Sequence, residues 1–180
     1  MTELEFNKNY WSYYILLEER FLKLKKYIEF DCDNYACYSC ELLSYLQTIC
    51  SEVDVIFKEI CGYPGEKYKN MGNYCVDHRR NCPDLVNRRV NVDYFGVEIQ
   101  PFKDLTENTL IQWWSAYNGV KHSRITNYKN GNLENVLFAL AGLYVLEKEL
   151  YKFITGNEKM NPESEFMHMV GWAESVHILF

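Results

Sequence analysis

The longest apolar run in the chain, residues 136–146, constrains the fold more than any other feature of the sequence. The run is apolar on every side of a helix, and Glu134 and Glu147 flank it. It is too short to cross a bilayer, because a membrane-spanning helix needs about 20 apolar residues. A helix that is hydrophobic all round is normally buried in a core. The run therefore predicts the buried central helix of a helix bundle.

Two earlier segments, residues 3–30 and 38–61, repeat their apolar residues every three or four positions, which is the spacing of an amphipathic helix. A third helix is predicted over residues 104–127, where Asp104 or Thr106 can cap its start. The apolar run belongs to a fourth helix over residues 133–154, which Asn132 can cap.

The remaining segments are less regular. Residues 90–99 alternate apolar and polar side chains around Phe95-Gly96, which predicts a small β-hairpin, whereas residues 66–87 show no period and predict a polar loop. Apolar residues at helical spacing predict a terminal helix at about 163–180, docked on the bundle or on a partner. The sequence thus predicts an all-α fold, a four- to five-helix bundle with a β-hairpin inserted between the second and third long helices, in a single domain over residues 1–180.

Composition restricts the classes of function. The chain has 180 residues, which suits one hydrophobic core, and its net charge of −6 means that nucleic-acid binding would need a local basic patch. The acidic start Met1-Thr2-Glu3 carries no secretory signal, and the odd count of 7 cysteines favours reduced thiols over a disulfide framework. These features predict a cytoplasmic protein without membrane contact.

The most informative segment runs from Gln112 to Arg124. In a helix, Trp114, Asn118 and His122 follow one another at four-residue spacing and share a face, and Lys121 and Arg124 stand beside it. Histidine can move protons near neutral pH, an amide can orient a hydroxyl, and cations can stabilise phosphoryl oxygens. This set of side chains indicates phosphate chemistry.

Gly119 lies within the same predicted helix, where glycine is less favourable than alanine by about 1 kcal/mol. We expect another backbone or a ligand to approach closely there. The alternative interpretation of the segment is structural: His122 and Asn118 would be buried and hydrogen-bonded, and the cations would simply complement the carboxyl end of a helix. An open cleft beside Asn118 and His122 would favour the first interpretation.

The spacing Asn118-x-x-x-His122, late in a long helix, resembles the motif of the HEPN superfamily of bacterial defence and toxin-associated domains. The motif of that family is Arg-x(4–6)-His, often with Asn after the Arg, and Tyr117 stands here at the position of the Arg. The resemblance implies a metal-independent RNA endonuclease, or a degenerate RNA-binding relative, acting as a homodimer in a defence or toxin–antitoxin setting. His122 would act as general base or acid, Asn118 would orient the groups, and Lys121 or Arg124 would neutralise charge.

Further candidates complete the site. Trp114, Tyr117, Arg79 and Arg80 are predicted to contact the substrate, since a basic run can bind phosphates. The alternative function is a non-catalytic helical module that binds a protein partner through its aromatic surfaces.

The cysteines offer one more set of ligands. Cys37-x-x-Cys40 with Cys75, His78 and Cys82 could bind zinc, but small buried thiols explain the cysteines better. No metal and no cofactor are therefore predicted.

Overall fold

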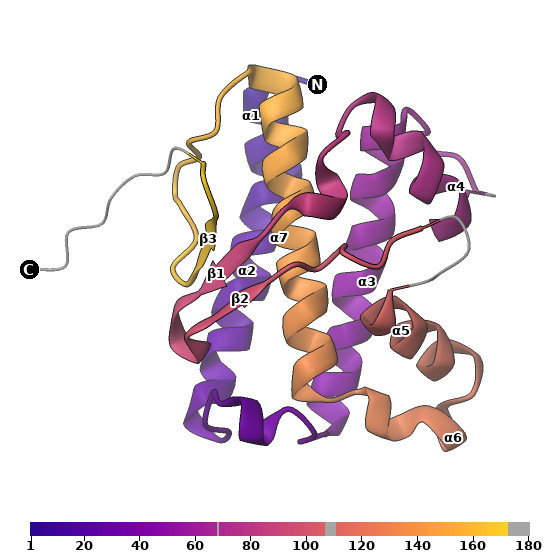
Figure 1. Ribbon diagram of the computed structural model, residues 1–180, viewed down its shortest axis with the longest axis vertical. Coiled ribbons are helices and arrows are strands. Elements are labelled where there is room, and N and C mark those ends of the chain that lie inside the picture. The colour runs from indigo at the N-terminus through magenta and orange to yellow at the C-terminus, as the bar shows by residue number, and fades with distance from the viewer. Residues whose placement is uncertain (68, 107–110, 173–180) are drawn as a thin grey trace, which may run out of the picture.

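A computed structural model describes residues 1–67, 69–106 and 111–172 (Figure 1). These residues are mainly helical, with one small antiparallel sheet. The prediction of a mainly helical chain with a small β element is therefore confirmed. No helix in the described ranges is long and apolar enough to cross a membrane.

The first helical rod consists of four successive segments. They are α1 (Glu3–Phe6), a π-helical stretch (Asn7–Trp11), α2 (Ser12–Leu22) and a 3-10 turn (Lys23–Lys26). The hydroxyl of Thr2 accepts a hydrogen bond from the backbone of Glu5, and the Glu5 carboxylate accepts one from the backbone of Thr2, which satisfies the free amides at the start. The rod matches the helix predicted over residues 3–30 but ends at residue 26.

Two side chains of this rod bind the end of the described chain. The indole of Trp11 donates a hydrogen bond of 2.7 Å to the carbonyl of Pro162. The buried carboxylate of Glu18 accepts hydrogen bonds from the hydroxyl of Ser164 and, at 2.7 Å, from the backbone amide of Glu165. The first and last described segments are therefore joined by specific polar contacts.

The two long helices, α3 (Cys40–Cys61) and α7 (Leu133–Thr155), form the largest contact between elements. Their capping residues are Ser39 and Gly62 for α3 and Asn132 and Gly156 for α7. Every side chain from residue 139 to residue 151 is buried, so the apolar run is the central helix that the sequence predicts.

The sheet has the strand order β2-β1-β3, formed by β2 (Val97–Ile99), β1 (Val90–Val92) and β3 (Met167–Met169), all antiparallel. In Figure 1 β1 and β2 run across α7, and β3, which contacts α7, lies at the side of α2. The β1–β2 hairpin is as predicted. The prediction of a terminal helix is wrong over residues 163–172, because β3 lies there and pairs with the free edge of β1. Residues 173–180 lie outside the described part.

A short helix, α4 (Met71–Asp77), occupies the segment predicted to be a polar loop. Asn70 and Asn73 exchange side-chain and backbone hydrogen bonds at its start, which supplies the capping that a short helix needs. Tyr74 stacks on Phe57 of α3, with ring centroids 5.1 Å apart. Tertiary packing therefore makes a helix of a segment without a clear period.

The predicted helix over residues 104–127 begins later and is broken. It consists of α5 (Gln112–His122), α6 (Arg124–Asn127) and a 3-10 turn (Tyr128–Asn130), with the extended residue Ser123 between α5 and α6. Asp104 and Thr106 do not cap α5, because Ile111 directly precedes it.

Trp113 anchors α5 on α7. The position of a Cβ on Gly142 would lie only 2.9 Å from the indole, so a glycine is needed at this contact. Figure 1 shows α4 and α5 beside α3, on the side away from α1 and α2.

A polar groove between α3, α4 and α5

A groove of about 420 Å³ lies where α3, the start of α4 and α5 meet. Its lining residues, which are mostly polar, are Ser51, Asp54, Lys69, Asn70, Met71, Gly72, Trp114, Tyr117, Asn118 and Lys121. Four of the predicted site residues therefore come together in one groove: Trp114, Tyr117, Asn118 and Lys121.

The wall formed by α5 exists because the helix is amphipathic. Trp113, Ala116 and Val120 are buried, whereas Tyr117 and Asn118 are half-buried at the edge of the core and Lys121 is exposed. The ring of Tyr117 lies 5.1 Å from that of Trp114 at an angle of 55°, and the ammonium of Lys121 lies 5.6 Å from the Tyr117 centroid. This wall presents an aromatic ring, an amide and a cation side by side.

The wall formed by α3 contributes a carboxylate that is already neutralised. Asp54 accepts a hydrogen bond of 2.8 Å from the hydroxyl of Tyr74, and the ammonium of Lys58 lies 2.6 Å from its other oxygen. Burial and the bond to Asp54 raise the pKa of Tyr74 above its ordinary value, so the phenol stays a donor. Asp54 therefore adds little negative potential to the groove.

The third wall is the approach to α4. The ammonium of Lys69 lies 4.0 Å from the centroid of the Tyr63 ring. The side-chain oxygen of Asn70 accepts a hydrogen bond of 2.9 Å from the amide of Gly72 and is thus occupied by capping. Lys69, which has no carboxylate partner among the described residues, is the cation of this wall.

His122 and Asn118 are not sealed in the core. His122 is exposed at the end of α5, Asn118 is half-buried, and neither side chain has a hydrogen-bond partner within the described ranges. The buried, hydrogen-bonded pair of the alternative interpretation is therefore not what the structure contains. Asn118 lines the groove, whereas His122 lies outside its lining.

The predicted arginines lie elsewhere. Arg124, on α6, reaches the side-chain oxygen of Gln47 of α3 at 3.4 Å. Arg79 and Arg80 are exposed on the turn after α4, where Arg80 lies 4.0 Å from Asp77, and neither lines the groove. The structure thus does not bring the predicted substrate-binding arginines to the groove.

Gly119 is closely approached by a side chain rather than by another backbone. The position of its missing Cβ lies 3.0 Å from the side-chain oxygen of Asn127, which folds back from α6. Asn127 in turn donates a hydrogen bond of 2.9 Å to the carbonyl of Ser123 and accepts one of 3.4 Å from Asn130. Gly119 therefore allows α6 and the following turn to fold back against α5.

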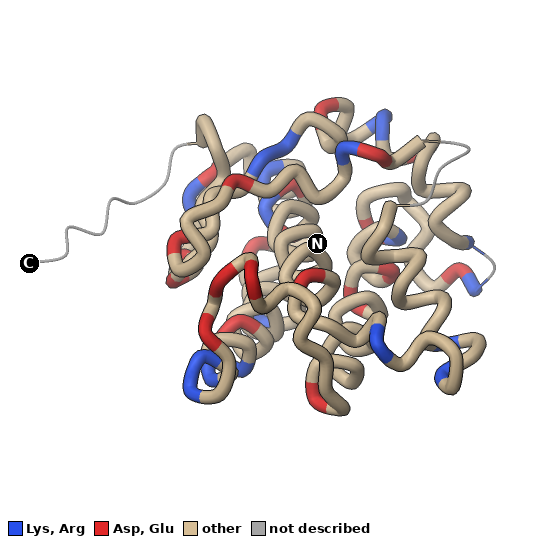
Figure 2. The backbone as a smooth tube through the Cα atoms, turned by 60° about the horizontal axis from the view of Figure 1, so that its bottom comes forward, with Lys and Arg blue, Asp and Glu red and all other residues tan. Residues whose placement is uncertain are grey.

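Residues 117–130, which we term the basic corner, carry a net positive charge. This stretch contains no Asp or Glu, although the whole chain has a net charge of −6. In Figure 2 the corner accordingly has blue segments and no red ones. Its exposed cationic or protonatable side chains are Lys121, His122, Arg124 and Lys129. None of them forms an ion pair with a residue that the structure describes.

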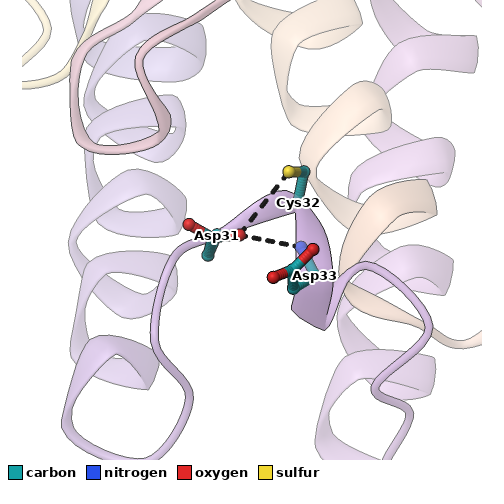
Figure 3. A group of neighbouring side chains, drawn as sticks. All are labelled: Asp31, Cys32 and Asp33. Carbon is teal, nitrogen blue, oxygen red and sulfur yellow. Dashed lines mark hydrogen bonds between the residues drawn. The ribbon is translucent and has the colours of Figure 1, made fainter.

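One group of potential metal ligands exists in the described part of the chain, formed by Asp31, Cys32 and Asp33 (Figure 3). All three are exposed, and Asp31 already accepts hydrogen bonds from the amide of Asp33 at 2.8 Å and from the thiol of Cys32 at 3.5 Å. These bonds form an ordinary turn, so the group gives no reason to infer a metal.

The second set of zinc ligands considered from the sequence is packed in the core. His78 and Cys82 are buried, and Nδ1 of His78 donates to the Cys82 carbonyl at 3.1 Å. Burial raises the pKa of the Cys82 thiol to about 12, which keeps it protonated. With Cys75 they do not form a group of converging ligand atoms among the residues described.

No protein-family model, no curated protein and no solved structure matches this chain. The resemblance to the HEPN superfamily therefore remains a prediction from the sequence.

Proposed function

We propose that this chain is a helical RNA-binding domain and that the basic corner is its interface with the phosphate backbone. The observation that carries the proposal is that the corner has basic side chains and no Asp or Glu, although the molecule as a whole is acidic. Its side chains Lys121, His122, Arg124 and Lys129 are all exposed. Phosphodiesters are the anions that such closely spaced cations bind best in cells, because each neutralised phosphate releases a counterion.

The contrast with other basic residues supports the proposal. Some basic side chains elsewhere are already paired with carboxylates: Arg20 lies 2.7 Å from Glu41, and Lys152 lies 2.6 Å from Glu158. In the corner, Arg124 makes only a long contact with the amide of Gln47. A guanidinium held so weakly remains available for a phosphate.

The enzymatic form of the proposal is RNA cleavage with His122 as general base. His122 would take the proton of a ribose 2′-hydroxyl while the 2′-oxygen bonds to phosphorus and the bond to the 5′-oxygen breaks; the 5′-oxygen would leave as a hydroxyl after taking a proton from water. The exposure of His122 at the end of α5 supports access of a phosphodiester. However, none of the described residues is hydrogen-bonded to the imidazole as an orienting partner, so binding is the function that the geometry supports best.

The test measures binding of a fluorescent single-stranded RNA. Lys121→Ala combined with Arg124→Ala removes two charges from the corner, and Lys23→Ala combined with Lys26→Ala removes two from another exposed turn. We expect the corner variant to bind at least about tenfold more weakly and to lower the slope of log affinity against log salt by about 1.4, or 0.7 per lost phosphate contact.

The control variant should bind like the wild type, and equal loss in both variants would overturn the proposal. The same RNA, incubated with EDTA, also serves as substrate for the wild type and His122→Ala. Equal cutting by the two proteins would remove His122 from the mechanism and leave an RNA-binding domain.

A further inference from the structure

The groove beside the basic corner has a chemistry that charge alone does not explain. We infer that it binds a single unstacked nucleotide, with the base against Tyr117 and the phosphate between Lys69 and Lys121. This inference rests on the proposed function, because the nucleotide belongs to the RNA whose backbone the corner holds. It goes further by assigning a site that distinguishes unpaired bases from duplex.

The size of the groove suits such a ligand. Ligand pockets commonly enclose about 300–1,000 Å³, and the groove has about 420 Å³. It is open on one side and closed by three separate elements: α3, α4 and α5. A base presented by a single strand can enter it, whereas a base in a duplex remains stacked and paired.

Tyr117 provides the stacking surface. Its ring is half-buried, tilted against Trp114 and part of the groove lining, so its position is fixed while part of the ring stays accessible. Proteins that bind single strands use such rings because every base has a π face. Trp114 itself is only 6% exposed and mainly supports Tyr117 from behind.

Two cations line the groove from different elements. Lys121 follows Tyr117 by one turn of α5, and Lys69 comes from the opposite wall. Neither has a carboxylate partner in the described part of the chain. The one carboxylate of the groove, Asp54, is already paired with Lys58 and bonded to Tyr74. The net field therefore favours an anionic group at the rim.

Unused polar groups can read the edge of the base. Asn118 offers both a donor and an acceptor, Ser51 offers a hydroxyl, and neither side chain is hydrogen-bonded to a described residue. The oxygens of Asp54 can also accept from an exocyclic amino group. The site is thus equipped for a nucleobase rather than for phosphate alone.

The experiment titrates the full chain with AMP, GMP, CMP and UMP and, as the baseless probe, ribose 5-phosphate, following binding by calorimetry. At least one nucleotide should bind about tenfold more tightly than ribose 5-phosphate, since base stacking on an aromatic ring is worth about 5- to 150-fold in affinity. Tyr117→Leu should remove that advantage, and Tyr117→Phe, which keeps the ring, should retain it.

Lys69→Ala tests the groove from a wall that does not touch Tyr117. It should weaken the binding of every nucleotide by about fivefold or more. Equal binding of ribose 5-phosphate and nucleotides, or unchanged binding by Tyr117→Leu and Lys69→Ala, would overturn the inference. If RNA binding depends on Lys121 and Arg124 but nucleotide binding is unchanged by Tyr117→Leu, only the proposed function stands. Nucleotide binding without RNA binding would leave only the groove.

Discussion

The contact between α3 and α7 and the basic corner treat charge in opposite ways. In the core, buried charged side chains have partners, with Glu147 as an exception: Lys148 is 0% exposed and lies 3.2 Å from Glu163, and Arg88 pairs with the buried Glu149. In the corner, residues 121–126 are all exposed and its cations have no carboxylate partners in the described structure.

This difference separates stability from recognition. Burying a charge is costly unless it is paired, so the partners in the core are a condition of folding. Exposed cations need no partner, and an unpaired one keeps its affinity for an external anion. The corner can therefore change its charge with little effect on the fold, whereas the core cannot. The three predictions below test this separation.

The largest expected effect is in the core. Leu46 of α3 is fully buried, so Leu46→Ala should lower the free energy of unfolding by about 2–5 kcal/mol through lost burial and the cavity left behind. Ile125 of α6 is 96% exposed, and Ile125→Ala should change it by less than about 0.5 kcal/mol. Denaturant unfolding of both variants measures the contrast. Comparable losses would show that the corner contributes to the core.

The second prediction concerns Glu147, which is 3% exposed and has one carboxylate oxygen without a hydrogen-bond partner. Burial, followed by the charge of Glu52, raises the pKa of Glu147 well above its ordinary value. As pH rises from the ordinary to the raised value, the unfolded chain loses this proton and the folded chain keeps it, so stability falls. Because Gln cannot titrate, Glu147→Gln does not lose this stability. Its free energy of unfolding, relative to that of the wild type, should therefore rise by about 1–3 kcal/mol between pH 4 and pH 8.

The exposed Glu19 supplies the matched control, and Glu19→Gln should show no such gain. Urea unfolding at the two pH values gives the difference directly. A difference between Glu147→Gln and the wild type that is the same at pH 4 and pH 8 would show that the carboxyl does not titrate in this range.

The smallest effect is expected at Gly119. Alanine there gains about 1 kcal/mol in helix propensity, but its Cβ would crowd the side chain of Asn127 at 3.0 Å. The two effects oppose, so Gly119→Ala should change the free energy of unfolding by less than about 1 kcal/mol. In an Asn127→Ala background the crowding disappears, and the same change should stabilise. A double-mutant cycle that shows no coupling would mean that α6 does not rest on α5.

The sequence predicts the elements whose pattern is local. The apolar run and the repeated apolar positions of α3 predict the ends of both long helices to within two residues. A helix that buries one face repeats its apolar residues at a regular spacing, and a helix that buries every face is continuously apolar. The hairpin is predicted for the same reason, since Val90, Val92, Val97 and Ile99 alternate with polar residues.

Tertiary contacts decide the parts that the sequence did not predict. β3 has apolar residues that also fit a helix, but Met167 and Met169 are buried on either side of His168 only because β1 offers its free edge. The same holds for the groove. Tyr117, Asn118 and Lys121 share a visible motif, whereas Ser51, Asp54 and Lys69 join them through packing that no local spacing reveals.

The hydrogen bonds that join Trp11 and Glu18 with residues 162–165 have a consequence for biosynthesis. The first helical rod leaves the ribosome before these partners have been translated; until then the Glu18 carboxylate has only the hydroxyl of Tyr14 to compensate its burial, and the indole N–H lacks its acceptor. The amino-terminal rod must therefore stay loosely docked on the nascent chain. It locks into place only when the segment that ends in β3 has emerged, so the earliest part of the chain is among the last to become fixed.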